Sequence, residues 1–121
     1  MECEASIEET RGEPARALAM FERALALAEA HGEALMAAKL HSHIGVHHKS
    51  RGDLDAAAAA QREALRRYEQ LQAAPLSIAN VLGRLGSIST LLGHGEAARS
   101  YFQRALAMLE ALPDGAGFYA G

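Results

Sequence analysis

The stretch Arg51-Gly52-Asp53-Leu54-Asp55-Ala56-Ala57 decides the fold, because altered copies of it occur twice more in the chain. Residues 11–17 read RGEPARA, and residues 92–98 read LGHGEAA. An Ala-Leu pair follows each copy, at residues 24–25, 64–65 and 105–106. The second residues of the copies are glycines, spaced by 40 residues (12 to 52) and 41 residues (52 to 93). A period of this size indicates stacked repeats of one supersecondary unit.

The composition indicates an all-α protein. Half of the 121 residues are apolar, and there are only three prolines and no tryptophan. Alanine and leucine, which prevail among the apolar residues, are strong helix formers. Apolar residues also recur every three or four positions, as at Ala17, Phe21, Ala24 and Ala28, which is the spacing of one helix face. We therefore expect an all-α fold.

Glycine and proline mark the expected helix ends. Gly32, Gly52 and Gly93 lie where one helical pattern stops and the next begins, and Pro75 suits the first turn of a helix. Successive helices should pack antiparallel, because the loops between them are short. Residues 113–121 read as a flexible tail. The expected helices span residues 2–10, 13–30, 34–50, 53–72, 76–92 and 95–112.

Two helix pairs carry a residue pattern that resembles the tetratricopeptide repeat family. In that family the first helix of a pair has a glycine in its middle, a turn glycine follows, and the second helix carries a small residue, an aromatic residue and an alanine. One repeat has in these places Leu40, Ile44, Gly45, His48, Gly52, Ala57, Gln61 and Ala64. The next has Leu82, Leu85, Gly86, Ser89, Gly93, Ala98, Phe102 and Ala105. An earlier, incomplete repeat matches at Gly12, Ala17, Phe21 and Ala24.

The resemblance implies a right-handed superhelix of antiparallel helix pairs over residues 1–112, with repeats at about 1–31, 33–72 and 75–112. In each full repeat the mid-helix glycine, Gly45 or Gly86, would let the two helices of a pair approach closely. Gln61 departs from the pattern, because it stands where the family has an aromatic residue. We therefore expect the second repeat to be the most loosely packed.

In this family the first helices of the pairs line the concave face, and ligand peptides lie there. Carried over by position, the groove holds three positive charges, Lys39, Lys49 and Arg84, and no acidic residue, although the chain has a formal net charge of −3. Between residues 34 and 50 the groove residues are Lys39, Ser42, His43, Val46, Lys49 and Ser50. Between residues 76 and 92 they are Asn80, Gly83, Arg84, Ser87 and Thr90.

The resemblance implies a protein–protein interaction scaffold, and this distribution of charge predicts that its groove binds an acidic peptide or a C-terminal carboxylate. Arg84 would hold a carboxylate with two parallel N–H donors, Lys39 would act as a point charge, and Asn80 would hydrogen-bond the ligand backbone. Reversing the charge of Lys39 and Arg84 to Glu should abolish binding with the fold intact. The alternative interpretation is that these are solvated positions on exposed helix faces.

The last expected helix suggests a different function, self-association. Stacked repeats need polar caps at their ends. Tyr101, Phe102, Leu106 and Leu109 lie on this helix, and the sequence shows no further helix to cover them. A homodimer stacked end to end would cover these residues, and so would the next repeat of a longer array.

Other function classes find no support in the sequence. No apolar run is long enough to span a bilayer, and the single cysteine, Cys3, fits a cytoplasmic protein because it forms no internal disulfide. The net charge of −3 is no basic excess, which argues against nucleic-acid binding. No catalytic constellation or phosphate-binding glycine loop is recognisable, so we expect neither an enzyme nor a bound cofactor.

Four histidines lie within residues 41–48. His43 and His47 are four residues apart on one helix face, a spacing that suits metal chelation, but no third ligand lies nearby and we expect no metal site. His41 and His48 fall at or beside core positions of the repeat. If either is buried in its neutral form, acid should destabilise the second repeat.

Overall fold

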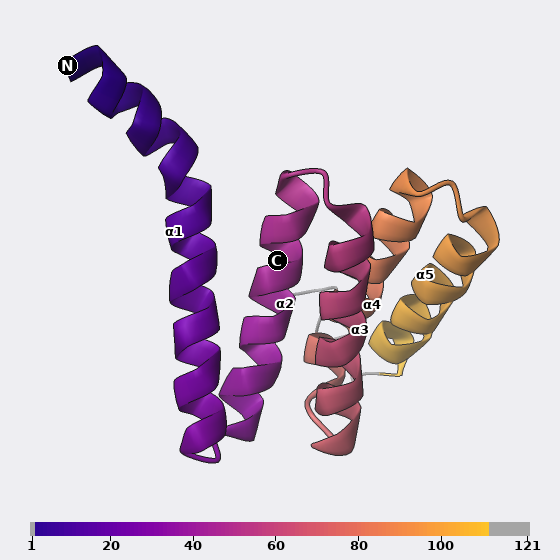
Figure 1. The fold of residues 1–121 in the computed structure, drawn as a ribbon. Helices are drawn as coiled ribbons and strands as arrows, with labels where there is room; N and C mark the ends of the chain where they lie inside the picture. The colour runs from indigo at the N-terminus through magenta and orange to yellow at the C-terminus, as the bar shows by residue number, and fades with distance from the viewer. Residues whose placement is uncertain (1, 112–121) are drawn as a thin grey trace, which may run out of the picture.

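A computed structural model describes residues 2–111, with side chains from residue 15 onward, and that part of the chain forms five α-helices. Short connections join the helices into one row of antiparallel neighbours (Figure 1), which confirms the expected all-α repeat fold. The expected tail at residues 113–121 lies outside the described residues. The helices are α1 (Glu2–Ala30), α2 (Ala34–Ser50), α3 (Leu54–Gln70), α4 (Pro75–Leu91) and α5 (Gly95–Glu110).

Helix α1 differs from the expectation of two separate helices at residues 2–10 and 13–30. It runs without interruption through Arg11 and Gly12 to Ala30. A glycine inside a helix costs about 1 kcal/mol, whereas continuing an existing helix avoids a new and costly nucleation. Figure 1 shows α1 bending in its N-terminal part. Pro14 lies inside α1 and has no N–H to donate to the carbonyl of Thr10, and a proline inside a helix is a common cause of a bend.

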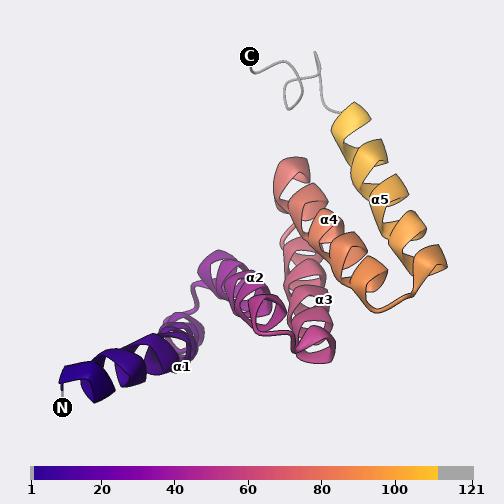
Figure 2. The ribbon, with the colours of Figure 1, turned by 90° about the horizontal axis from the view of Figure 1, so that it is seen from above.

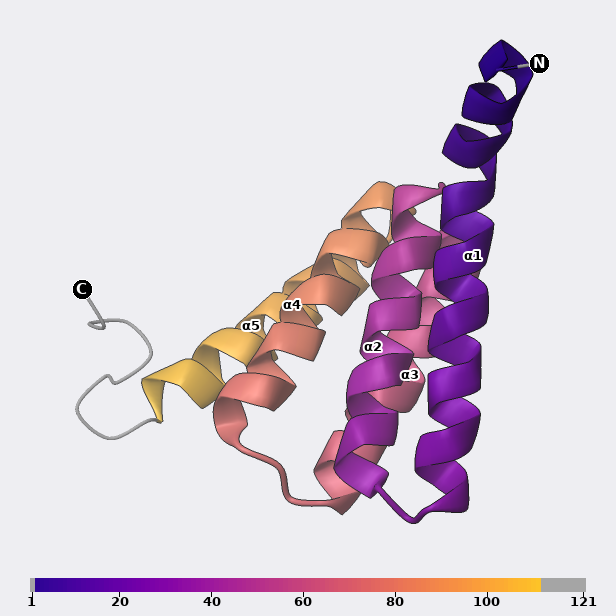
Figure 3. The ribbon, with the colours of Figure 1, turned by 90° about the vertical axis from the view of Figure 1, so that its left-hand side faces the viewer.

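The helices alternate between two sides of the row. Helix α2 packs mainly on α3, and α4 mainly on α5, while α1 and α2 as well as α3 and α4 form the contacts between these pairs. Helices α2 and α4 also touch each other, so they share one side of the row, with α3 and α5 on the other (Figure 2). The N-terminal part of α1 projects beyond the ends of the other helices (Figure 3).

Residues with a left-handed backbone end four of the helices. Gly52 and Gly93 have φ angles of +84° and +82°, and the N–H of each following residue bonds back to the carbonyl five positions earlier. Gly32 ends α1 in the same way, with φ of +70°. After α3 the same place is taken by Gln72, at φ of +52°. This 6→1 bond satisfies a carbonyl that the helix end leaves free.

The main core lies between α3 and α4. It is formed by buried residues of these two helices with Ala38 of α2 and Ala105 of α5, and Leu82, Leu85 and Ile88 are almost completely enclosed. A smaller core joins α1 to α2 through Ala28, Ala37 and Leu40. None of the described helices has the combination of length and apolar character that crossing a membrane requires.

Two glycines permit the close contact of the helix pairs. A Cβ atom on Gly45 would lie 2.7 Å from the side-chain nitrogen of Gln61, and one on Gly86 would lie 2.8 Å from the ring of Phe102. Gln61 and Phe102 therefore occupy equivalent places in successive repeats. Gln61 is completely buried and makes two hydrogen bonds with Ser42, so the residue that departs from the pattern is itself well packed. The expectation that the second repeat is the most loosely packed stays a prediction.

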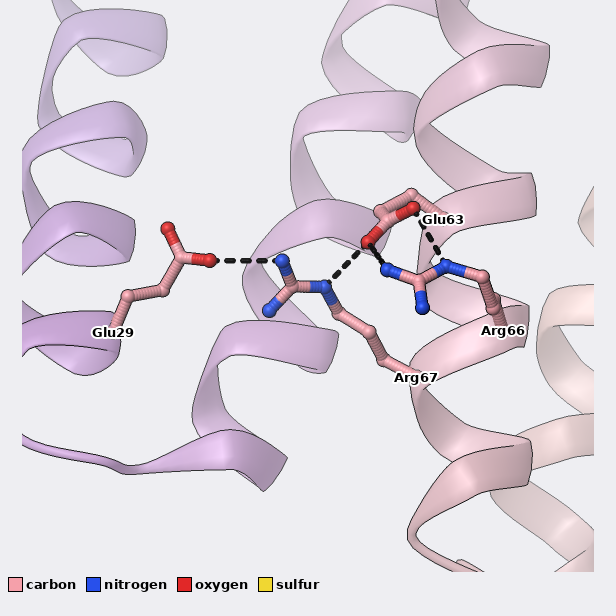
Figure 4. Close-up of polar contacts among 4 residues, drawn as sticks. All are labelled: Glu29, Glu63, Arg66 and Arg67. Atoms are coloured by element: carbon pink, nitrogen blue, oxygen red, sulfur yellow. Dashed lines mark hydrogen bonds and ion pairs between the residues drawn. The ribbon is translucent and has the colours of Figure 1, made fainter.

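A cluster of charged side chains joins α1 to α3 (Figure 4). Glu63 pairs with Arg66 and, at 2.7 Å, with Arg67, and Arg67 also reaches Glu29 of α1 at 2.8 Å. Hydrogen bonds from Arg66 and Arg67 lower the pKa of Glu63 to about 2. The surface of α3 therefore carries a mixed-charge cluster that contacts α1.

Candidate functional site

A cavity of about 200 Å³ lies between α2, the end of α3 and α4, and we call it the cationic cavity. Lys39 and Arg84 supply its two fixed positive charges, and no acidic side chain is among the described residues that line it. Five of the expected groove residues meet here. The lining consists of Lys39, Ser42, His43, Tyr68, Ser77, Asn80, Val81 and Arg84.

Ser42 fixes the position of Arg84. Arg84 Nη1 donates a hydrogen bond to Ser42 Oγ, and this hydroxyl in turn donates to Gln61 Oε1 at 2.8 Å. Gln61 Nε2 closes the network by donating to the backbone carbonyl of Ser42 at 2.9 Å. A buried polar network that is satisfied in this way holds its members rigidly. Because a guanidinium has five N–H donors, Arg84 keeps donors for a ligand after bonding Ser42.

The other polar groups of the cavity complement an anion. Burial raises the pKa of the Tyr68 hydroxyl, against the opposing effect of the charge on Arg84, so this group stays protonated. Lys39 and Asn80 are exposed on α2 and α4. The ring of His43 stacks on Phe21 of α1, with ring centroids 5.8 Å apart, which fixes one wall of the cavity. The arrangement suits a carboxylate that approaches from solvent.

Six of the expected groove residues lie outside this cavity, namely Val46, Lys49, Ser50, Gly83, Ser87 and Thr90. Lys49 Nζ donates a hydrogen bond to Ser87 Oγ at 3.1 Å, so these two side chains contact each other across α2 and α4. Val46 is exposed on α2. The hydroxyls of two further groove positions bond to backbone carbonyls of their own helices, Ser50 to His47 and Thr90 to Gly86.

The residues expected to mediate self-association divide into two groups. Tyr101 and Leu109 are half-buried and pack against the main core. Phe102 and Leu106 keep 45% and 48% of their surface exposed. Only the second pair is therefore accessible on α5.

The histidines of α2 are held by different neighbours. His47 packs edge-on against His48, with ring centroids 6.1 Å apart, whereas His43 stacks on Phe21. Across the part of the chain with described side chains, no three His, Cys, Asp or Glu residues lie together as a metal site requires. His41 is half-buried, and its Nε2 atom is enclosed without a hydrogen-bond partner in the described structure.

Sequence reasoning missed part of the cavity wall. Tyr68 and Ser77 line the cavity, although neither belongs to the positions that the repeat pattern assigns to the groove. Tyr68 ends the apolar face of α3, and Ser77 lies in the first turn of α4. Both residues lie close to the short connection between α3 and α4. The shortness of that connection in the sequence was the signal that could have placed them beside the groove.

Comparison with known proteins identifies one segment. A family model described as tetratricopeptide repeat matches residues 42–71, which run from the middle of α2 to the end of α3. No curated protein and no solved structure matches the chain. Repeats of this family generally act as non-enzymatic scaffolds for protein–protein interaction. Residues 42–71 are therefore similar to a tetratricopeptide repeat, which supports the resemblance found in the sequence.

Proposed function

We propose that this protein is an interaction scaffold that binds an acidic peptide segment of a partner protein on the side formed by α2 and α4. The observation that carries the proposal is the cationic cavity, where Lys39 and Arg84 face a shared space without an acidic lining residue in the described structure. The chain as a whole has a formal net charge of −3, so this local sign is opposite to the average. Such separation of charge attracts and orients an anionic ligand.

In this proposal the cavity residues have different roles. Arg84, held by Ser42, donates to a ligand carboxylate, and Lys39 contributes a mobile point charge. Asn80 and Tyr68 donate to remaining oxygens of the ligand. Lys49 and Ser87 contact one another and lie at the far end of the same face, where only a longer peptide reaches. The single cysteine, Cys3, is compatible with action in the cytoplasm.

The first test is selection of peptides from a random display library against the wild-type protein. Lys39→Glu serves as the counter-selected variant, because Lys39 is exposed and its reversal leaves the buried network of Arg84 intact. Acidic peptides should be enriched by the wild type and lost with Lys39→Glu. Arg62→Glu is the control, because Arg62 is exposed on α3 and lies outside the cationic cavity, and it should retain them. Enriched peptides without acidic residues would contradict the proposal.

A second candidate function is self-association through the two ends of the row. Large apolar side chains are exposed at both, namely Met20 and Leu27 on α1 and Phe102 and Leu106 on α5. Stacked repeats bury such faces against a neighbouring repeat. Sedimentation velocity should then show a concentration-dependent dimer that Leu27→Glu and Leu106→Glu each dissociate. A monomer at all concentrations up to about 100 µM, the range of weak associations, would exclude this candidate.

A further inference from the structure

A second cavity adjoins the cationic cavity, and we call it the apolar cavity. Its volume is about 360 Å³, and it lies between the start of α2 and the connection from α3 to α4. Lys39 and Ser77 line both cavities, so the two spaces are neighbours. The lining consists of Leu35, Lys39, Leu71, Ala73, Ala74 and Ser77.

The apolar cavity has the size and chemistry of a site for a hydrophobic side chain. A closed cavity of about 150 Å³ lined by apolar side chains is large enough for benzene, so a space of 360 Å³ admits a leucine or phenylalanine side chain. Leu35 and Leu71 contribute large apolar surfaces that are nearly half exposed to solvent. The one charged side chain of its lining is Lys39, which combines an apolar stem with a charged end.

We infer that the ligand carries two recognised side chains, an acidic one for the cationic cavity and a large apolar one for the apolar cavity. This inference rests on the proposed function and adds to it the chemistry of a second ligand position. In an extended peptide the side chains of residues i and i+2 point to the same side, about 7 Å apart. Because the two cavities share Lys39 and Ser77, the proposed element is an acidic residue and a leucine or phenylalanine two positions apart.

The test uses four labelled nonapeptides in a glycine–serine–alanine host, with dissociation constants measured by fluorescence anisotropy at one fixed low salt concentration. The first has Glu and Leu two positions apart, the second replaces Leu with Ser, and the third replaces Glu with Gln. The fourth keeps both residues but separates them by six positions. Each of the last three should bind about tenfold more weakly than the first, because each leaves one cavity unfilled.

Two protein variants assign the apolar contact to the cavity. Leu35→Ser removes part of the apolar lining, and Leu76→Ser is its matched control, because Leu76 lies outside both cavities on the first turn of α4. The two leucines are equally accessible, with 48% and 47% of their surface exposed, so both changes should leave the fold intact. With Leu35→Ser, the tenfold preference for the first peptide over its Ser form should fall below about threefold. With Leu76→Ser, the preference should remain.

Failure of the two-residue element and failure of the proposed function give different results in this experiment. If the Glu peptides bind but the Leu to Ser change alters affinity less than twofold, the bipartite element is wrong and the proposed function stands. If the peptide with Gln in place of Glu binds as well as the first, the requirement for an acid is wrong, and both proposals fall. Binding of none of the four at high micromolar concentration would overturn both as well.

Discussion

Gly45 and Gly83 are both helical glycines, but their surroundings differ. A Cβ atom on Gly45 would lie within 3 Å of three side-chain atoms of Gln61, whereas a Cβ atom on Gly83 would meet nothing within 4 Å. Since Gln61 is completely buried and bonded to Ser42, it has no free space into which to move. At the scale of single residues, the closest contacts therefore decide which glycines the fold requires.

Alanine substitutions at these two glycines should change stability in opposite directions. Gly45→Ala should lower the free energy of unfolding by about 1–3 kcal/mol, because overpacking displaces Gln61. Gly83→Ala should raise it by about 1 kcal/mol, because alanine is the better helix former and no neighbour opposes the added methyl group. Urea unfolding followed by circular dichroism measures both. A stabilising Gly45→Ala would show that the helix pair has room to adjust.

The pKa of His41 should make the protein less stable in mild acid. Burial lowers this pKa below 6.5, and the charge on Arg67 lowers it further, with a smaller contribution from Arg66. Glu63 and Glu29 act in the opposite direction. Below pH 6.5 the unfolded chain therefore binds a proton that the folded protein binds less readily, so stability is lost as pH falls through 6.5.

Melting temperatures at about pH 7.5 and about pH 5.5 test this expectation, since the window spans the ordinary histidine pKa. The wild type should melt at a lower temperature at the acidic pH. His41→Gln, which keeps a polar group but removes the titration, should show a smaller loss between the two values. An equal loss in both proteins would assign the acid sensitivity to other groups. Glu63 acts in a separate window, because its stabilising effect is lost only as pH falls from 4.5 toward 2.

At the scale of helices, the backbone conformation of the residue that follows a helix determines how the helix ends. Three of the described helices are followed by a glycine with positive φ, but the corresponding residue after α3 is Gln72, which adopts φ of +52°. This left-handed conformation costs a residue with a Cβ atom about 1–2 kcal/mol. The end of α3 therefore stores strain that the ends of α1, α2 and α4 do not.

Gln72→Gly should relieve this strain and raise the free energy of unfolding by about 0.5–1 kcal/mol, the remainder being offset by the greater freedom of glycine in the unfolded chain. Gln70→Gly is the matched control, because Gln70 is the last residue of α3 and is helical. This control should destabilise the protein by up to about 1 kcal/mol. If Gln72→Gly proves destabilising, side-chain contacts of Gln72 outweigh its backbone strain.

Helix boundaries followed from the sequence wherever a glycine ended a helix, as at Gly52 and Gly93. The same residue type misled at Gly12, because a glycine is tolerated inside a helix when the chain gains more by continuing it. Whether a glycine ends or merely weakens a helix depends on the packing beyond it, which a local pattern does not contain. The division into repeats at 1–31, 33–72 and 75–112 stays a prediction.

The candidate site was predictable to the extent that helix periodicity determines it. Lys39, Asn80 and Arg84 share a face because of their positions relative to Gly45 and Gly86, and the structure brings them together in one cavity. The bond between Lys49 and Ser87 was not predictable, because it depends on how closely α2 and α4 approach at that level. The apolar cavity was missed for a similar reason, since its wall includes the connection between α3 and α4.

At the scale of the whole molecule, stability should be distributed unevenly along the row. The main core between α3 and α4 contains the most enclosed side chains, including Leu82 and Leu85, whereas α1 exposes Met20 and Leu27 and is held by a smaller core. In a stacked array each helix is supported mainly by its neighbours, so helices at the ends open first.

Amide hydrogen exchange followed by mass spectrometry should therefore rank the helices. Protection should be greatest in α3 and α4, intermediate in α2 and α5, and least in α1, because local opening is easiest where few apolar contacts are lost. Leu82→Ala should lower protection throughout α3 and α4 together, since it removes a buried side chain that both share. Equal protection of all helices would indicate one cooperative unit.

The hydroxyl of Ser42 belongs at once to the proposed binding site and to the interior. It accepts a hydrogen bond from Arg84 on α4 and donates one to Gln61 on α3, while its own backbone lies in α2. A ligand held by Arg84 is thereby mechanically connected to three helices of two successive pairs. Under the proposed function, tension on a bound partner would be shared by the interior and not carried by one surface side chain.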